Sequence, residues 1–327
     1  MVGGNFNLVL MPTLGCNAKC DHCCMASEPK KASLKLLEGE MAQAIGNAFK
    51  AGSKSVVFTG GEPTMYMERL LNPMTVAYSL GMYVDLRTNA KWAVSKKRAY
   101  EVLATLQMHG LQRLGLSYGL YQKDYVDLEC IVNAAKAAEQ LGIVVYIDWI
   151  GETKLMESAL NEFGVDLSKV RMIGNAARLG RAVRLGDSHF DKISIEAIEN
   201  ESEFSHSCGG DGELPSLTIL PGGYASFHQC CWINPRLIYK VQNSNGNGNW
   251  FNMFIKKANK DVATVFLRDY GIGGLIKKAK TEHPELLRSY YSHQCEACYD
   301  LLGVLFPRED VLPRFLQDLQ PTCGGGK

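Results

Sequence analysis

The sequence lacks any segment that would carry it to or across a membrane. Its start, residues 1–13, has no charged stretch followed by a long apolar run, which excludes a signal peptide. No stretch approaches the roughly 18 uncharged apolar residues of a membrane span. An excess of charge is also missing, since 35 basic and 34 acidic residues give a formal net charge of +1, without a basic stripe. We therefore expect a cytoplasmic protein, most simply a monomer, that binds neither membranes nor nucleic acid.

Loops that cradle nucleotide phosphates are missing as well. No GxGxxG follows a predicted strand and no P-loop is present, so nothing indicates a dinucleotide ligand. Cysteine, in contrast, is abundant, with 11 among 327 residues. Disulfides are disfavoured in the cytosol, so metal binding is the leading interpretation of these cysteines. Most of them fall into two groups, one near the start of the chain and one in its last third.

Strand-like and helical segments alternate over the first part of the chain. Apolar and β-branched runs predict strands at residues 7–13, 53–59, 82–88, 111–117, 143–150 and 170–173. Apolar residues at helical spacing predict helices at 34–50, 65–80, 95–109, 125–141 and 157–163. This βα repeat predicts a parallel sheet, and six units are too few for a closed eight-stranded barrel. We expect a partial (β/α)6 TIM-like barrel over residues 1–186, with its chemistry at the C-terminal ends of the strands.

The pattern changes after about residue 186. Residues 217–227 read as a hairpin that turns at Pro221-Gly222-Gly223, and residues 242–249 as a flexible loop. Helical segments are predicted at 251–258, 262–270 and 274–280, and the tail is expected to be disordered. We expect residues 187–327 to form a small second domain.

The first cysteine group directly follows the first predicted strand. Cys16, Cys20 and Cys23 have CxxxCxxC spacing within GCNAKCDHCC. Three thiolates on a tight loop can hold three irons of a [4Fe–4S] cluster and leave the fourth iron open for catalysis. A structural zinc site is the alternative, and it would need His22 or Cys24 as a fourth ligand.

A second motif, TGGEP at residues 59–63, ends the second predicted strand. Its paired glycines would let the backbone approach a ligand closely, and the carboxylate of Glu62 could receive an ammonium group. Alone, the motif could be a tight turn. Combined with CxxxCxxC after the preceding strand, it is a specific signal.

With these two motifs, the sequence resembles the radical S-adenosylmethionine superfamily. The resemblance implies a [4Fe–4S] cluster on the three cysteines, S-adenosylmethionine on its open iron, a 5′-deoxyadenosyl radical, and an electron donor of the flavodoxin or ferredoxin type. It also implies cofactor contacts by His22, Gly60, Gly61, Glu62, Pro63, Thr88, Asn89, Ser117 and Arg181. Strand-end turn residues are the alternative for Thr88, Asn89 and Ser117, and a surface arginine is the alternative for Arg181.

The second cysteine group provides one thiol more than a four-ligand site needs. Cys208, one member of the Cys230-Cys231 pair, and the CxxC of Cys295 and Cys298 would complete an auxiliary [4Fe–4S] cluster or a zinc site. The arrangement resembles the auxiliary-cluster domain called twitch. Packing without metal is the remaining alternative, and it is favoured for Cys130; Cys24 and Cys323 are expected to be bystanders.

The order of motifs resembles, more narrowly, the radical peptide epimerases, which convert L-residues of ribosomally made peptides into D-residues. That resemblance makes Cys230 a cluster ligand, Cys231 the hydrogen-atom donor, and Asp211 the candidate for an acidic residue of the catalytic site, although Asp211 could be a turn residue. The implied partner is a precursor peptide, held by the barrel opening and the second domain because about six residues precede the first strand. Two alternatives stay open: crosslinking or oxidation of a peptide on the same scaffold, and a non-catalytic metal-binding module.

Overall fold

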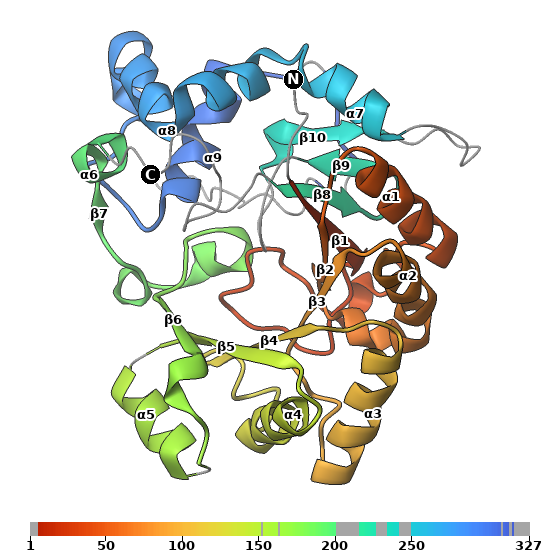
Figure 1. Ribbon diagram of the computed structural model, residues 1–327. Coiled ribbons are helices and arrows are strands. Elements are labelled where there is room, and N and C mark those ends of the chain that lie inside the picture. The colour runs from red at the N-terminus through yellow and green to blue at the C-terminus, as the bar shows by residue number, and fades with distance from the viewer. Residues whose placement is uncertain are drawn as a thin grey trace.

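The architecture is an open, curved α/β sheet with helices along its outer side (Figure 1). A computed structural model describes residues 6–151, 153–162, 164–200, 216–226, 234–241, 250–308, 310–313 and 316. Six parallel strands lie side by side in chain order: β1 (Asn7–Thr13), β2 (Ser55–Gly60), β3 (Tyr83–Thr88), β4 (Arg113–Gly119), β5 (Val144–Ile150) and β6 (Val170–Gly174). The predicted partial barrel is therefore confirmed.

A helix follows each of the first five strands, as predicted. These helices are α1 (Glu38–Lys50), α2 (Met67–Ser79), α3 (Lys96–Met108), α4 (Leu128–Gln140) and α5 (Thr153–Glu162). The helix predicted over residues 34–50 begins only at Glu38, because the preceding segment pairs with the end of β1. There the Leu14 amide donates to the Leu34 carbonyl at 2.9 Å, and the Leu36 amide donates to the Pro12 carbonyl at 2.8 Å.

Helix starts and core faces follow from local chemistry. Ser95 caps α3, because its hydroxyl oxygen accepts the Arg98 amide at 3.2 Å. Alternate residues of the strands, such as Val84 and Leu86 of β3, pack against the helices in one large apolar core. The opposite face of the sheet is partly polar: Arg113 of β4 pairs with buried Asp85 of β3 at 2.7 Å.

The predicted hairpin is confirmed, and it continues the sheet of the barrel. Strands β8 (Ser216–Leu220) and β9 (Tyr224–Ser226) are antiparallel, and Gly222 and Gly223 between them take positive φ angles of 81° and 76°. Strand β10 (Ile238–Lys240) pairs with β9. Strand β8 pairs in parallel with β1, so the described sheet has the order β10-β9-β8-β1-β2-β3-β4-β5-β6. The sequence did not predict this pairing.

The last helices of the chain form a second apolar core beside the sheet, whereas the buried residues of Trp250–Ala258 belong to the main core (Figure 1). Helix α7 is Trp250–Ala258, and α8 (Val262–Glu282) turns at Gly271 (φ 61°), between the two helices that the sequence predicts there. The sequence missed α6 (Ile195–Asn200), α9 (Gln294–Leu305), and the small ribbon of β7 (Ile193–Ser194) with β11 (Tyr290–Tyr291). None of the described helices combines the length and apolar character that crossing a membrane requires.

Candidate active site

The first three cysteines lie on the loop after β1, at the C-terminal edge of the sheet. Cys20 is buried, and Cys16 and Cys23 are half-buried, all as free thiols. Backbone amides point at two sulfurs: Ala18 donates to Cys16 Sγ and Ser27 donates to Cys23 Sγ, each at 3.4 Å. Removal from water raises the pKa of Cys16 and of Cys20 to about 12, and the nearby Glu62 carboxylate adds to the shift at Cys16. Thiolates at these positions therefore need a bound cation.

Glycines bring the GGEP loop directly against the cysteine loop. The Gly61 amide donates to the Thr13 carbonyl at 2.8 Å, and the Glu62 amide donates to the Gly15 carbonyl at 2.7 Å. A Cβ atom on Gly61 would lie 1.9 Å from the Gly15 oxygen. Gly60 has a φ of 121°, and Pro63 is buried at the start of the next turn. These glycines thus permit the close approach of two backbone segments.

Glu62 is buried and connects the ends of β2 and β3. Its Oε1 accepts from the Thr64 amide at 3.1 Å, the Thr64 hydroxyl at 2.5 Å and the Thr88 hydroxyl at 2.8 Å, while Oε2 accepts the Asn89 amide at 2.8 Å. Burial raises the pKa of Glu62, and these hydrogen bonds oppose the rise. Asn89 Nδ2 also donates to Asn17 Oδ1 at 2.8 Å and lies 3.8 Å from Cys16 Sγ. Thr88 and Asn89 therefore belong to the same polar cluster as Glu62 and Cys16.

His22 lies within the cysteine loop and stacks on Tyr121, with ring centroids 4.8 Å apart. Its Nε2 is 3.3 Å from Gln122 Nε2. Burial lowers the pKa of His22 to about 4, and the Arg181 charge adds to the decrease, so the ring is neutral at pH 7. Ser117 lies half-buried on β4, opposite Asp148 of β5, and its side chain makes no hydrogen bond to those predicted site residues that the structure describes.

Arg181 is buried, which excludes the alternative of a surface arginine. Its guanidinium donates to the Cys20 carbonyl at 2.6 Å and to the Ser27 carbonyl at 2.7 Å. Its backbone amide donates to the Cys23 carbonyl at 3.0 Å. Arg181 thus holds the backbone of the cysteine loop in place, a role that the sequence did not suggest.

The CxxC motif lies at the start of α9. The His293 side chain accepts the Cys295 amide at 3.1 Å and caps the helix, and Cys298 is buried. Asn234 Nδ2 lies 3.4 Å from the Cys298 carbonyl and 3.7 Å from Cys298 Sγ. Five residues singled out from the sequence lie outside the described residues: Cys208, Asp211, Cys230, Cys231 and Cys323.

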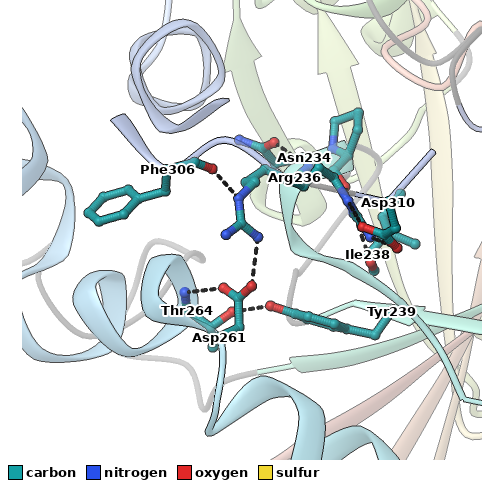
Figure 2. A network of polar contacts seen from close by, with 10 residues as sticks. Asn234, Arg236, Ile238, Tyr239, Asp261, Thr264, Phe306 and Asp310 are labelled. Carbon is teal, nitrogen blue, oxygen red and sulfur yellow. Dashed lines mark hydrogen bonds and ion pairs between the residues drawn. The ribbon is translucent and has the colours of Figure 1, made fainter. Parts of the chain in front are cut away.

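The segment that contains Asn234 is fixed to the C-terminal helices by a polar network (Figure 2). Arg236 donates to Asp261 at 2.7 Å and to the Phe306 carbonyl, and Asp261 accepts the Thr264 amide at 2.9 Å as the cap of α8. Arg308 donates to the Ile238 carbonyl at 2.9 Å. Sequence reasoning missed four polar residues: Asn234, Arg178, Ser292 and Glu296. Two signals for them were available in the sequence, the Asn234-Pro235 pair and the position of Glu296 between the two cysteines of CxxC. In the described ranges, no three His, Cys, Asp or Glu side chains are grouped to hold a single metal ion.

Comparison with known proteins shows which kind of domain contains the first cysteine loop. Residues 10–118 match the family model of the radical SAM superfamily. This region is a radical SAM domain. The family implies S-adenosylmethionine and a [4Fe–4S] cluster, and the site fits both: three free thiols on one loop, backbone N–H groups directed at two of them, and a buried carboxylate nearby.

One curated relative and two solved structures are similar to more of the chain. YydG of Bacillus subtilis (strain 168), a protein named for peptide biosynthesis, is 24% identical over 266 residues, which cover 78% of each chain. SuiB of Streptococcus suis bound to precursor peptide SuiA is 19% identical with a TM-score of 0.45; the match covers 56% of this chain and 42% of the SuiB chain. Native anSMEcpe with bound AdoMet and Cp18Cys peptide is 12% identical with a TM-score of 0.49, covering 96% and 99%.

Proposed function

We propose that this protein is a radical SAM peptide epimerase, which converts L-residues to D-residues in a ribosomally made peptide. The radical SAM domain supports radical chemistry, and the name of the relative YydG supports a peptide as the substrate. The contact between Asn234 and Cys298 supports a second cluster site, because it connects the chain next to Cys230-Cys231 with the CxxC motif. The narrower proposal is carried by the thiol of the Cys230-Cys231 pair that a four-ligand site leaves over.

At the first site, we assign the cluster to Cys16, Cys20 and Cys23. Arg181 holds the carbonyls of their loop, and the glycines of GGEP hold that loop against β2. The bound cluster and S-adenosylmethionine would supply a 5′-deoxyadenosyl radical. Among the described residues, Glu62 Oε2 accepts one hydrogen bond and so has capacity for an ammonium group. Neutral His22 presents an aromatic ring at the same loop.

At the second site, we assign an auxiliary cluster to Cys208, Cys230, Cys295 and Cys298. An extended chain advances about 3.5 Å per residue, so covalent geometry keeps Cys230 within roughly 14 Å of both Ser226 and Asn234. Ser226 is buried in β9 and Asn234 is beside Cys298, so both ends of this short segment are fixed. One thiol of the pair can therefore reach the CxxC motif, and we assign residues 187–327 to this second site.

The remaining thiol, Cys231, is the proposed hydrogen-atom donor. The bound cofactor would supply the radical that takes one hydrogen atom from the peptide Cα, which would leave a near-planar Cα radical. The weak S–H bond of Cys231 returns a hydrogen atom to the opposite face, which inverts the centre. One electron from a flavodoxin- or ferredoxin-type donor and one solvent proton then restore the thiol. We assign Asp211 a role in this proton transfer.

The test is a reaction with a candidate precursor peptide in D₂O. Epimerisation should add about one mass unit per converted residue, because the returned hydrogen comes from an exchangeable thiol. A Cys231→Ala variant should still form 5′-deoxyadenosine but no D-residue, whereas the buried helix cysteine variant Cys130→Ala should behave as wild type. A loss of about two mass units would instead assign the chain to crosslinking or oxidation. Normal epimerisation by Cys231→Ala would refute the donor assignment.

A further inference from the structure

A short segment after β6 contacts both cysteine regions. It runs from Arg178 to Arg181, and its last residues are buried. At one end it meets the loop of Cys16, Cys20 and Cys23. At the other end it meets helix α9 with Cys295 and Cys298. Two sites that lie almost 280 residues apart in the sequence are thus joined through a few residues.

At its C-terminal end, the segment is packed on the first cysteine loop without free space. Arg181 makes its three donor contacts there, to the carbonyls of Cys20, Cys23 and Ser27. Gly180 has a φ of 58°, and a Cβ atom on it would lie 2.2 Å from the Cys24 carbonyl oxygen. Backbone therefore touches backbone, and a movement of the segment would move the loop.

At its N-terminal end, the segment is bonded to the turn that starts α9. The Arg178 amide donates to Ser292 Oγ at 2.7 Å. That hydroxyl donates to Glu296 Oε2 at 2.7 Å, and the same carboxylate oxygen accepts the Ser292 amide at 2.7 Å. Glu296 is buried, lies between Cys295 and Cys298, and also accepts Arg288 at 2.9 Å. The Arg178 guanidinium lies over the Phe190 ring, 4.5 Å from its centroid.

The two ends of the segment are close together in the chain. Three peptide units reach at most about 11 Å when extended, and both ends carry hydrogen bonds with well-formed distances. The intervening Leu179 is buried as well. The segment therefore limits how far the cysteine loop and α9 can move apart.

We propose that residues 178–181 are a positioning bridge, which fixes helix α9 relative to the cysteine loop. Its catalytic consequence rests on the proposed function: hydrogen is removed on one side of the peptide Cα and returned from the other, so both sites must face one carbon atom. A misplacement of about 1 Å between reacting groups costs on the order of 100-fold in rate. Ser292 is the positioning residue that closes the bridge, because its hydroxyl contacts both Arg178 and Glu296.

The first experiment measures whether a change at the start of α9 affects the cysteine loop, and it does not depend on catalysis. Hydrogen–deuterium exchange of the anaerobically purified full-length protein is compared for wild type, Ser292→Ala and Ser292→Thr. Ser292→Ala should accelerate exchange several-fold in residues 16–28, which it does not touch, and Ser292→Thr should restore the wild-type rate because it keeps the hydroxyl. The control is Arg184→Met, an exposed arginine in the same region. Unchanged exchange at residues 16–28 in Ser292→Ala would overturn the bridge.

The second experiment measures its effect on the reaction. In Ser292→Ala, iron content should match wild type while the ratio of epimerised peptide to 5′-deoxyadenosine falls about 10-fold. An unchanged ratio would overturn the positioning role. If wild type itself makes no D-residue, the proposed function fails, and the exchange experiment still decides whether the bridge exists.

Discussion

The two cysteine regions are held in place by different means. The first loop is fixed by backbone contacts that glycines allow, such as Gly61 against Gly15, and by the buried guanidinium of Arg181. The CxxC helix is fixed by side-chain contacts of Glu296 with Arg288 and Ser292, partly open to solvent at Arg288. Close backbone packing accepts no added atoms, whereas polar side-chain contacts accept conservative changes at moderate cost. The first region should therefore be the less tolerant to mutation.

Gly61→Ala should have the largest effect, because the new Cβ would lie 1.9 Å from the Gly15 carbonyl oxygen and two backbone segments would have to separate. We expect the free energy of unfolding to fall by about 4 kcal/mol, with loss of the first cluster. Chemical denaturation and iron analysis measure both. Gly46→Ala in α1, where nothing lies within 4 Å, is the matched control and should be neutral or stabilising. Equal behaviour of the two variants would contradict the tight packing of this loop.

Arg181→Met should rank second. The change removes two charge-assisted hydrogen bonds, to the Cys20 and Ser27 carbonyls, which costs about 3 kcal/mol. The Cys20 carbonyl keeps the Cys23 amide at 3.1 Å as a donor, whereas the Ser27 carbonyl loses the donor that Arg181 supplied. Denaturation curves measure the loss, and Arg184→Met serves as the exposed control. A variant as stable as the control would mean that the guanidinium does not hold the loop.

Glu296→Gln tests the second region and should cost less, about 2 kcal/mol. An amide accepts at only one end, so its NH₂ group would face either the donors of Ser292 or the guanidinium of Arg288. Denaturation of the variant beside exposed Glu196→Gln, which should change stability by less than about 0.5 kcal/mol, measures the difference. If Glu296→Gln proves more damaging than Gly61→Ala, the ranking of the two regions is reversed.

Cys130→Ala should have the smallest effect. Cys130 is buried in α4 within the main apolar core, so losing its sulfur should cost about 1 kcal/mol through a small cavity. Iron content should equal that of wild type, because this cysteine belongs to neither group. A loss of iron in this variant would contradict the division of the cysteines into two groups of cluster ligands and a separate packing residue, Cys130.

The sequence predicted well the features that depend on short stretches of chain. Apolar and β-branched runs located the six parallel strands, and CxxxCxxC and GGEP located two loops that the structure brings into contact. Helix α9 was missed, because its first turn contains cysteines and a glutamate rather than a regular apolar stripe. Polar partners across the sheet, such as Asp85 and Arg113, were also missed, since their pairing depends on strand register.

The role of Arg181 shows a second limit of sequence reasoning. The resemblance implied a cofactor contact for Arg181, which stays a prediction, and gave no sign that its donors reach carbonyls of a loop about 160 residues earlier in the chain. Likewise, the link from Arg178 through Ser292 to Glu296 joins residues more than 100 positions apart. Such contacts follow from the three-dimensional path of the chain and leave no local periodicity to detect.

The parallel pairing of β1 with β8 has a consequence for biosynthesis. Leu8 is opposite Leu217 and Leu10 is opposite Ile219. One edge of β1 therefore pairs with a strand that lies roughly 200 residues later in the chain. While the chain emerges from the ribosome, that hydrogen-bonding edge stays open until most of the protein has been made. Pairing over such long sequence distances slows folding, and an unprotected edge attracts other chains. Nascent chains that stop before β8 should therefore depend on chaperones, and the pairing of β1 with β8 should form late in folding.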